Sequence, residues 1–166
     1  MTEESANKNQ IKTVVSAVIP YENGFVYVHT SKDNKWGLPG GKIGLFEEIN
    51  CALSREIKEE TGLDILLENN SFLGVWDFRS ERGSCVNNKV FYGKIFGGSL
   101  IENRPNEIKE IKILTLGEIR KFYHDGKIRA GRANLEPVEE FLRGTRYPCK
   151  FNSYFILTQY LKTPTL

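Results

Sequence analysis

The chain has 166 residues, of which 40% are hydrophobic and 27% are charged, a composition typical of one globular domain. Its formal net charge of +2 is too small for a dedicated nucleic-acid binder, which carries a strong basic excess. No apolar stretch is long enough to cross a bilayer. The three cysteines are far apart in the chain and form no CxxC pair, which favours neither a disulfide framework nor a zinc site.

The N-terminal end differs in composition from the rest of the chain. Residues 1–10 are polar and predict a flexible tail, so that residues 11–166 form a single domain. Glu3 and Glu4 stand where a secretory signal would carry positive charge. We therefore expect a cytoplasmic protein that does not bind membranes.

The first elements of the domain are expected to be strands. Residues 11–20 and 25–30 are rich in Val, Ile, Phe and Tyr, and the turn-like segment between them favours a hairpin. Residues 36–41, with the sequence WGLPGG, are expected to form a tight loop because Gly and Pro interrupt regular structure.

The strongest helix signal follows this loop. Residues 47–61 contain neither Gly nor Pro, and their apolar positions Ile49, Leu53 and Ile57 are spaced by four residues. This spacing places the three side chains on one face of a helix. Gly62 follows directly and is a typical C-terminal stop signal.

Strands and helices alternate in the remainder of the chain. Strands are expected over residues 72–80, 89–96 and 111–114, and helices over residues 116–123, 135–142 and 151–161. A polar segment joins the first two strands, and a loop opened by Gly97 and Gly98 follows the second. Strands interleaved with helices predict the α/β class, here an α/β/α sandwich with a mixed β-sheet.

The segment richest in chemical information lies on the expected helix. Glu56, Glu59 and Glu60 are spaced i, i+3 and i+4, so they share one helical face within about one turn. Such a group repels itself unless a cation is present, and Mg²⁺ and Mn²⁺ prefer carboxylate oxygens. A Glu-rich helix is more often only a solvated face, and these three residues alone do not exclude that interpretation.

The surrounding residues favour the functional interpretation. Gly41 is followed after five residues by Glu47 and after seven more by the run REIKEETGL, residues 55–63. This segment closely resembles the Nudix signature, in which Gly, Glu, Arg-Glu, Glu-Glu and Gly stand at these same spacings. Many fixed positions at set distances make a chance match improbable. The chain is therefore identified as a member of the Nudix family of hydrolases.

The resemblance implies a Nudix-type α/β/α sandwich and an enzyme dependent on Mg²⁺ or Mn²⁺. Such an enzyme hydrolyses a diphosphate linkage in a nucleoside di- or triphosphate derivative, such as a small nucleotide or nucleotide sugar. The implied metal ligands are Glu56, Glu59, Glu60 and the backbone oxygen of Gly40. Arg55 would orient Glu56, and Glu47 would be an accessory ligand or a loop anchor. The structural positions of the signature are Gly41, Glu47 and Gly62.

The base that activates the attacking water differs among Nudix enzymes. A Glu of the box helix, such as Glu59, serves in some of them, and a later Glu serves in others. Glu107 and Glu110 occupy the later position here, and we favour Glu107 as an extra metal ligand or base. Both residues stand near lysines, and an ordinary exposed role for them has equal weight.

Substrate contacts are less well defined. Trp76 and Phe78 share one face of an expected strand and could stack on a base, although sheet core is the plainer interpretation. A basic cluster could contact phosphate, with Arg120 as its leading candidate, although such clusters more often form a solvated surface. The cluster comprises Arg120, Lys121, Lys127, Arg129 and Arg132.

Other functions remain as alternatives at this stage. A non-catalytic nucleotide-binding regulator of the same fold usually lacks one or more of the box acids, and an isoprenyl diphosphate isomerase has a degenerate box; both are disfavoured by the intact box. RNA 5′-end hydrolysis ranks below small nucleotides because no pronounced basic tract is present. ADP-ribose cleavage loses support, since no proline occurs between Asp64 and Asn103. A homodimer is one possible assembly, because dimers are common in the family.

Overall fold

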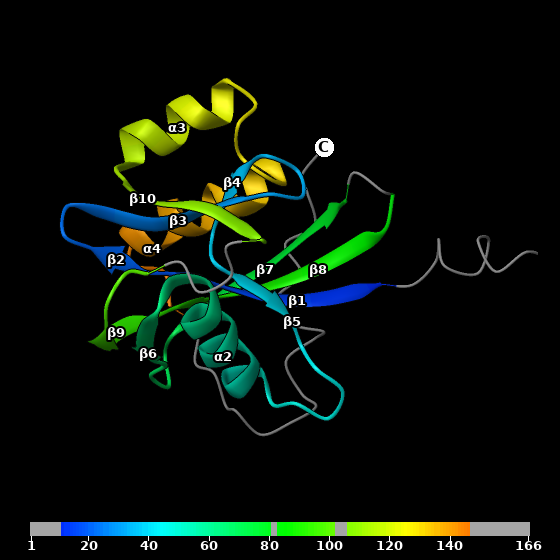
Figure 1. The fold of residues 1–166 in the computed structure, drawn as a ribbon, viewed down its shortest axis with the longest axis vertical. Coiled ribbons are helices and arrows are strands. Elements are labelled where there is room, and N and C mark those ends of the chain that lie inside the picture. The colour runs from blue at the N-terminus through cyan, green and yellow to red at the C-terminus, as the bar shows by residue number, and fades with distance from the viewer. Residues whose placement is uncertain (1–10, 81–82, 102–105, 147–166) are drawn as a thin grey trace, which may run out of the picture.

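The structure, a computed structural model, describes residues 11–80, 83–101 and 106–146. In the described residues, a run of five strands, one helix and a second run of five strands come before the last two helices (Figure 1). The strands are β1 (Lys12–Val18), β2 (Pro20–Tyr21), β3 (Gly24–Thr30), β4 (Trp36–Gly37), β5 (Gly40–Lys42), β6 (Leu63–Leu66), β7 (Phe72–Arg79), β8 (Cys85–Tyr92), β9 (Lys94–Gly98) and β10 (Ile108–Leu114). The helices are α2 (Ile49–Thr61), α3 (Leu116–His124) and α4 (Glu136–Leu142), with a 3₁₀ turn η2 (Gly131–Asn134) before the last.

The largest sheet contains the strands that support the functional site. Its order is β5-β1-β8-β7. β1 runs parallel to β8 and antiparallel to β5, and β7 and β8 form an antiparallel pair. The sheet is therefore mixed, as the alternation of strands and helices predicts.

A second sheet has the order β10-β3-β2, with β4 paired to the outer part of β3. Strands β6 and β9 form a separate antiparallel ribbon next to the end of α2. Helix α2 lies on one side of the sheets, and α3 and α4 lie on the other side (Figure 1). The expected α/β/α sandwich is confirmed.

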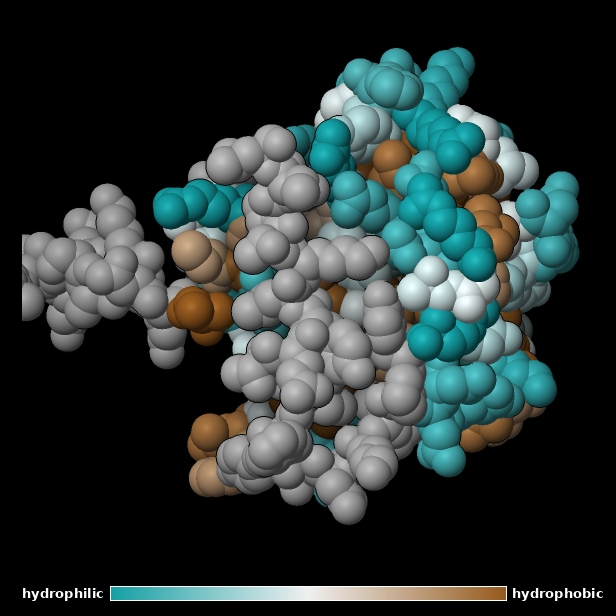
Figure 2. Space-filling model, turned by 180° about the vertical axis from the view of Figure 1, so that it is seen from behind, coloured by the Kyte–Doolittle hydropathy of each residue, from teal (hydrophilic) through white to brown (hydrophobic). Residues whose placement is uncertain are grey.

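Two apolar clusters hold these layers together. One joins α2 to β1 through Leu53, Ile57 and Val15, which are fully buried. The other gathers Leu38, Ile119 and Val138 beneath α3 and α4. On the face shown in Figure 2, polar side chains dominate the described surface, and apolar ones form small separate patches. The cores on both sides fix α2 and the segment around Leu38 relative to each other.

The expected hairpin between residues 11–20 and 25–30 is wrong. Both edges of β1 are occupied by β5 and β8, so β1 has no edge left for β3. The chain instead crosses to the second sheet after Ile19, and only the short β2 pairs with β3. A local turn signal indicates that the chain reverses, but it does not indicate which strands become neighbours.

Other boundaries differ in smaller ways. β8 begins at Cys85, four residues before the expected strand, and β9 is a separate strand paired with the unpredicted β6. The loop predicted over residues 36–41 contains the short strands β4 and β5. The tail over residues 1–10 and the helix predicted over residues 151–161 lie outside the described residues. Within the described part of the chain, no helix is both long and apolar enough to span a membrane.

Candidate metal and phosphate site

Helix α2 carries the three clustered carboxylates on a firmly docked element. Leu53 and Ile57 are fully buried, as the spacing predicts. The helix ends at Gly62, whose φ of 78° is left-handed, a conformation that favours glycine. A Cβ at this position would lie 2.4 Å from the carbonyl oxygen of Ser99. Both the backbone conformation and the close packing at Gly62 therefore require glycine at the end of α2.

The carboxylates differ in exposure. Glu56 and Glu60 are both 6% exposed, whereas the side chain of Glu59 is 36% exposed. Charged carboxylates are rarely buried to this extent without a partner of opposite charge or a set of donors. The site therefore holds two buried acids and one that remains accessible to solvent.

The glycine pair of β5 lies directly against the two buried acids. The backbone N–H of Gly40 donates to Oε2 of Glu60 at 2.8 Å. Gly40 has φ of 144°, and a Cβ there would lie 2.1 Å from the carbonyl oxygen of Val15. A Cβ on Gly41 would lie 2.4 Å from Cδ of Glu56. Only glycine at both positions leaves space for β5 to approach the carboxylates.

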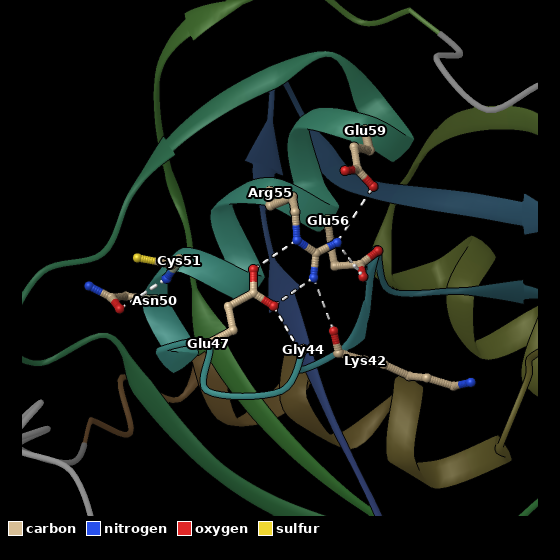
Figure 3. Close-up of polar contacts among 8 residues, drawn as sticks. All are labelled: Lys42, Gly44, Glu47, Asn50, Cys51, Arg55, Glu56 and Glu59. Carbon is tan, nitrogen blue, oxygen red and sulfur yellow. Dashed lines mark hydrogen bonds and ion pairs between the residues drawn. The ribbon is translucent and has the colours of Figure 1, made fainter.

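Arg55 connects the acids through its planar fork (Figure 3). Its Nε and Nη2 donate to the two carboxylate oxygens of Glu47 at 2.8 and 2.9 Å, and Nη1 donates to Oε1 of Glu56 at 2.8 Å. Nη1 also lies 3.6 Å from Oε2 of Glu59. Bidentate pairs of this kind fix orientation as well as charge, so Arg55 sets the direction of the Glu56 carboxylate.

Glu47 also closes the loop before α2. Its Oε2 accepts a hydrogen bond of 2.8 Å from the backbone N–H of Gly44, and Nη2 of Arg55 donates to the carbonyl oxygen of Lys42 at 3.2 Å. The hydrogen bonds from Arg55 and Gly44 lower the pKa of Glu47 to about 2. This geometry is that of the loop anchor, one of the two roles that the resemblance implies.

The electrostatics of Glu60 indicate a need for positive charge. Burial raises the pKa of its carboxyl to about 7, and the negative charges of Glu56 and Glu107 add to that shift. The Gly40 amide and the charge of Arg129 act in the opposite direction but do not cancel it. A carboxyl in this state binds a proton near neutral pH unless a cation replaces the proton.

Glu107 stands at the start of β10, across from α2. Its carboxylate is exposed, its backbone oxygen accepts a hydrogen bond of 2.7 Å from Ser31, and its charge acts on Glu60. Glu110 instead lies 3.1 Å from Nζ of Lys112. Of the two later acids suggested by the sequence, Glu107 is therefore the one whose charge acts on the α2 cluster.

The residues present fit a hard divalent cation. Among the described residues, no three His, Cys, Asp or Glu side chains are gathered closely enough to ligate one ion as they stand. Mg²⁺, however, is usually held by one or two carboxylates, with waters and substrate phosphates completing its shell. Glu56 and Glu60 provide the buried oxygen donors for such a site, and Glu59 a more exposed one.

The segment that precedes the glycine pair is supported by Asn134, a residue that the sequence did not single out. Asn134 is 4% exposed. Its Oδ1 accepts a hydrogen bond of 2.7 Å from the N–H of Leu38, and its Nδ2 donates to the carbonyl oxygen of Arg129 at 2.8 Å. These bonds link η2 to the segment preceding Gly40. No local periodicity could have indicated them, because the partners are remote in sequence.

The residues predicted to contact substrate lie in different surroundings. Trp76 donates from Nε1 to Oε2 of Glu136 on α4 at 3.0 Å. Arg120 binds Glu139 through Nε and Nη2 at 3.0 and 2.8 Å. Phe78 borders a groove of about 680 Å³ at the far end of the large sheet. Trp76 and Arg120 thus have partners within the protein. Contact of substrate with Trp76, Arg120 or Phe78 stays a prediction.

Comparison with known proteins identifies the family of the chain. The model of the NUDIX domain family matches residues 11–135, a range that contains the glycine pair, all of α2, Glu107 and Asn134. The chain belongs to the Nudix family, and this family match identifies it as a Nudix hydrolase.

Individual relatives show the same affiliation. An ADP-ribose pyrophosphatase from Methanocaldococcus jannaschii is 35% identical over 92 residues, which cover 54% of this chain and 52% of that protein. The chain thus matches about half the length of this relative. A NUDIX hydrolase from Nitrosomonas europaea has a similar fold, with a TM-score of 0.75, 23% identity and coverage of 88% and 98%. A MutT NUDIX hydrolase from Burkholderia pseudomallei has a TM-score of 0.59 and 26% identity, covering 66% and 86%.

Proposed function

We propose that this Nudix hydrolase cleaves the diphosphate linkage of a small nucleoside di- or triphosphate derivative in a reaction that depends on Mg²⁺ or Mn²⁺. The observation that carries the proposal is the placement of two buried carboxylates, Glu56 and Glu60, against the glycine pair of β5. Burial of this acidic pair is unfavourable in the absence of a cation, which supports metal binding as the function of the pair.

In this proposal Glu56, Glu59 and Glu60 hold the ion, and the backbone oxygen of Gly40 is a further ligand. The ion would neutralise charge on the phosphate oxygens and lower the pKa of the attacking water. Arg55 keeps Glu56 aimed at the ion, and Glu47 holds Arg55. These two are positioning residues, since they act through Glu56 and through the loop before α2.

The reaction consists of one displacement. The oxygen of water attacks one phosphorus atom, and the bond from that phosphorus to the bridging oxygen breaks. The bridging oxygen leaves with the other phosphate, and a proton of the water passes to a carboxylate. Glu59 and Glu107 are the candidates for this base, because both are at least partly exposed and lie near the buried acids. Positioning and charge neutralisation contribute most of the rate in such reactions.

The substrate class is proposed more broadly than a single compound. The relative named as an ADP-ribose pyrophosphatase favours ADP-ribose, whereas the absence of a proline after the box disfavours it. RNA with a triphosphate 5′ end is the second candidate, and the basic side chains of α3 and the loop after it favour it modestly. The small net charge of +2 keeps small nucleotides first.

The test is a hydrolysis screen in Mg²⁺, in Mn²⁺ and in chelator. The panel contains nucleoside triphosphates with oxidised ones among them, nucleotide sugars, ADP-ribose, dinucleoside polyphosphates and triphosphate-ended RNA. Glu59→Gln is the blank, because the substitution removes a charge without changing the size of the side chain. Exposed Glu22→Gln is the matched control.

The proposal is supported if one class of substrate is hydrolysed only with metal, by the wild type and by E22Q but not by E59Q. That class is then the substrate of the enzyme. A folded wild-type protein that hydrolyses nothing in the panel, yet binds a nucleotide, contradicts it. That outcome favours the non-catalytic regulator instead.

A further inference from the structure

Arg129 lies across the site from α2, on a segment that is tied to the residues before the glycine pair. The backbone N–H of Trp36 donates to the carbonyl oxygen of Lys127 at 2.9 Å, and the N–H of Arg129 donates to that of Trp36 at 2.7 Å. Ile128 and Trp36 form a parallel bridge. The backbone of Arg129 is therefore held in register with β4, a few residues from Gly40.

The Nε–Nη2 edge of the Arg129 guanidinium faces Gly37. A Cβ on Gly37 would lie 2.8 Å from Nη2, 3.0 Å from Nε and 3.2 Å from Cζ of this arginine. Nη2 also donates a long hydrogen bond of 3.4 Å to the carbonyl oxygen of Leu38. The absence of a side chain at position 37 thus creates the place where the charged group rests.

A buried network fixes this arrangement from behind. Asn134 bonds both to the N–H of Leu38 and to the carbonyl oxygen of Arg129, and the hydroxyl of the fully buried Tyr27 donates to the carbonyl oxygen of Asn134. Asn134 thus links the backbones of Leu38 and Arg129, and Tyr27 holds the backbone of Asn134. Such a network is characteristic of preorganised ligand contacts.

Arg129 also differs from the other members of the basic cluster in its charge partners. Arg120, Lys127 and Arg132 have Glu139, Asp125 and Glu136 within 4.0 Å, in that order. For Arg129, no ion pair within that distance is found in residues 11–80, 83–101 and 106–146, although its charge lowers the pKa of Glu60. Within the described residues, its side-chain hydrogen bond is the long one to Leu38, so its strong donors are only weakly used.

We propose that Arg129 is the phosphate anchor of the enzyme, binding the oxygens of the substrate's diphosphate from the side opposite α2. The inference rests on the proposed function for the identity of the ligand. A guanidinium fork forms two parallel hydrogen bonds to phosphate oxygens. Among the residues that the structure describes, the side-chain bond that it would exchange for them is the 3.4 Å one to Leu38. The anchor selects substrates by their diphosphate group and leaves the nucleoside to other residues.

The test measures binding rather than turnover. The probe is methylenediphosphonate, a pyrophosphate analogue whose bridge cannot be hydrolysed, titrated calorimetrically into the folded protein with Mg²⁺ present. Arg129→Ala is expected to weaken binding about ten- to hundredfold, because a charge-assisted bidentate pair is lost. Arg129→Lys retains the charge without the fork, so its affinity should lie between those of the wild type and R129A. Arg143→Ala, which removes an exposed arginine paired with Glu140 on α4, leaves binding unchanged.

Gly37→Ala provides the second variant. The backbone of Gly37 is not in the left-handed region, so alanine is compatible with it, and the three atoms nearest to the added methyl all belong to the end of the Arg129 side chain. Weakened binding in G37A with an unchanged melting temperature therefore supports positioning of the guanidinium, even where R129A is poorly folded.

The outcomes separate this inference from the proposed function. Binding by R129A or G37A within twofold of the wild type, or no binding by the wild type, overturns the anchor. Binding that depends on Arg129, in a protein that hydrolyses nothing in the panel, supports the anchor and contradicts hydrolysis.

Discussion

The carboxylate of Glu56 occupies the space that a side chain at position 41 would fill. A Cβ on Gly41 would lie 2.4 Å from Cδ and 2.5 Å from Oε2 of Glu56, well inside van der Waals contact. Glu56 cannot retreat easily, because it is 6% exposed and its Oε1 is bound by Arg55 at 2.8 Å. The second glycine of the pair therefore determines where this acid lies.

Gly41→Ala is expected to abolish turnover while the protein stays folded. The φ of Gly41 is one that alanine adopts, so the cost falls on the displaced Glu56 carboxylate and on the metal that we propose it holds. Hydrolysis rate and melting temperature are measured together. Gly117→Ala is the control, because its nearest atom is 4.0 Å away on the surface of α3. Wild-type activity in G41A would show that Glu56 does not need its present position.

Glu47→Gln is expected to lower stability in a manner that depends on pH. The folded pKa of Glu47 is about 2, below the ordinary value of 4.5, so its contribution is complete above about pH 4.5 and is lost as the pH falls toward 2. The gap in melting temperature between the wild type and E47Q should therefore narrow from pH 5 to pH 3. A gap that stays constant over this range contradicts the ion pair as its source.

Glu60→Gln is expected to stabilise the metal-free protein. Burial raises the pKa of Glu60 in the folded protein from 4.5 to about 7. The folded state therefore binds the Glu60 proton more tightly than the unfolded state does, and the free energy of unfolding of the wild type falls as the pH rises through this range. In chelator at pH 8, E60Q should exceed the wild type by up to about 3 kcal/mol in the free energy of unfolding, and the gap should close by pH 4, below the unfolded pKa of 4.5.

Denaturant unfolding of both proteins at the two pH values measures this difference. Mg²⁺ at pH 8 should then stabilise the wild type and leave E60Q unchanged, since ligands that bind only the folded state raise its stability. If E60Q is less stable than the wild type at pH 8 without metal, burial of the ionised Glu60 carboxylate does not destabilise the folded protein.

Asn134→Ala should cost more stability than Tyr27→Phe. The alanine variant leaves the N–H of Leu38 without its buried acceptor and frees the backbone of Arg129, at a cost of about 2–4 kcal/mol for two lost partners. Tyr27→Phe removes one hydroxyl bond to the carbonyl oxygen of Asn134, at about 1 kcal/mol. Chemical denaturation measures both. Equal losses would indicate that Asn134 is not the centre of the network.

Local spacing was enough to predict much of the site. The carboxylate face of α2, the stop at Gly62 and the contact of Arg55 with Glu56 follow from positions within one or two helical turns, where 3.6 residues per turn determines neighbours. The class of fold also followed, since alternating strands and helices leave few layer arrangements.

The remainder depends on contacts between distant parts of the chain. The hydrogen bond from Leu38 to Asn134 spans 96 residues, and that from Arg129 to Leu38 spans 91. The parallel pairing of β1 with β8 is equally remote. Each of these contacts is decided by packing of the whole domain, so no periodicity at residues 129 or 134 could indicate them. Composition alone placed Arg129 in the basic cluster suggested for phosphate, without distinguishing it from the other members.

The most direct test of the metal centre is the hydrolysis rate as a function of Mg²⁺ concentration, measured for the wild type and for Glu56→Gln on the substrate that the screen identifies. We predict that the rate of the wild type rises with Mg²⁺ concentration to saturation and that it shows no turnover in chelator. The rate of E56Q should be at least about 100-fold lower at every concentration, because the substitution removes the proposed metal ligand whose carboxylate Arg55 orients. Equal rates for the two proteins, or undiminished wild-type turnover in chelator, would contradict a carboxylate-bound metal as the origin of the activity.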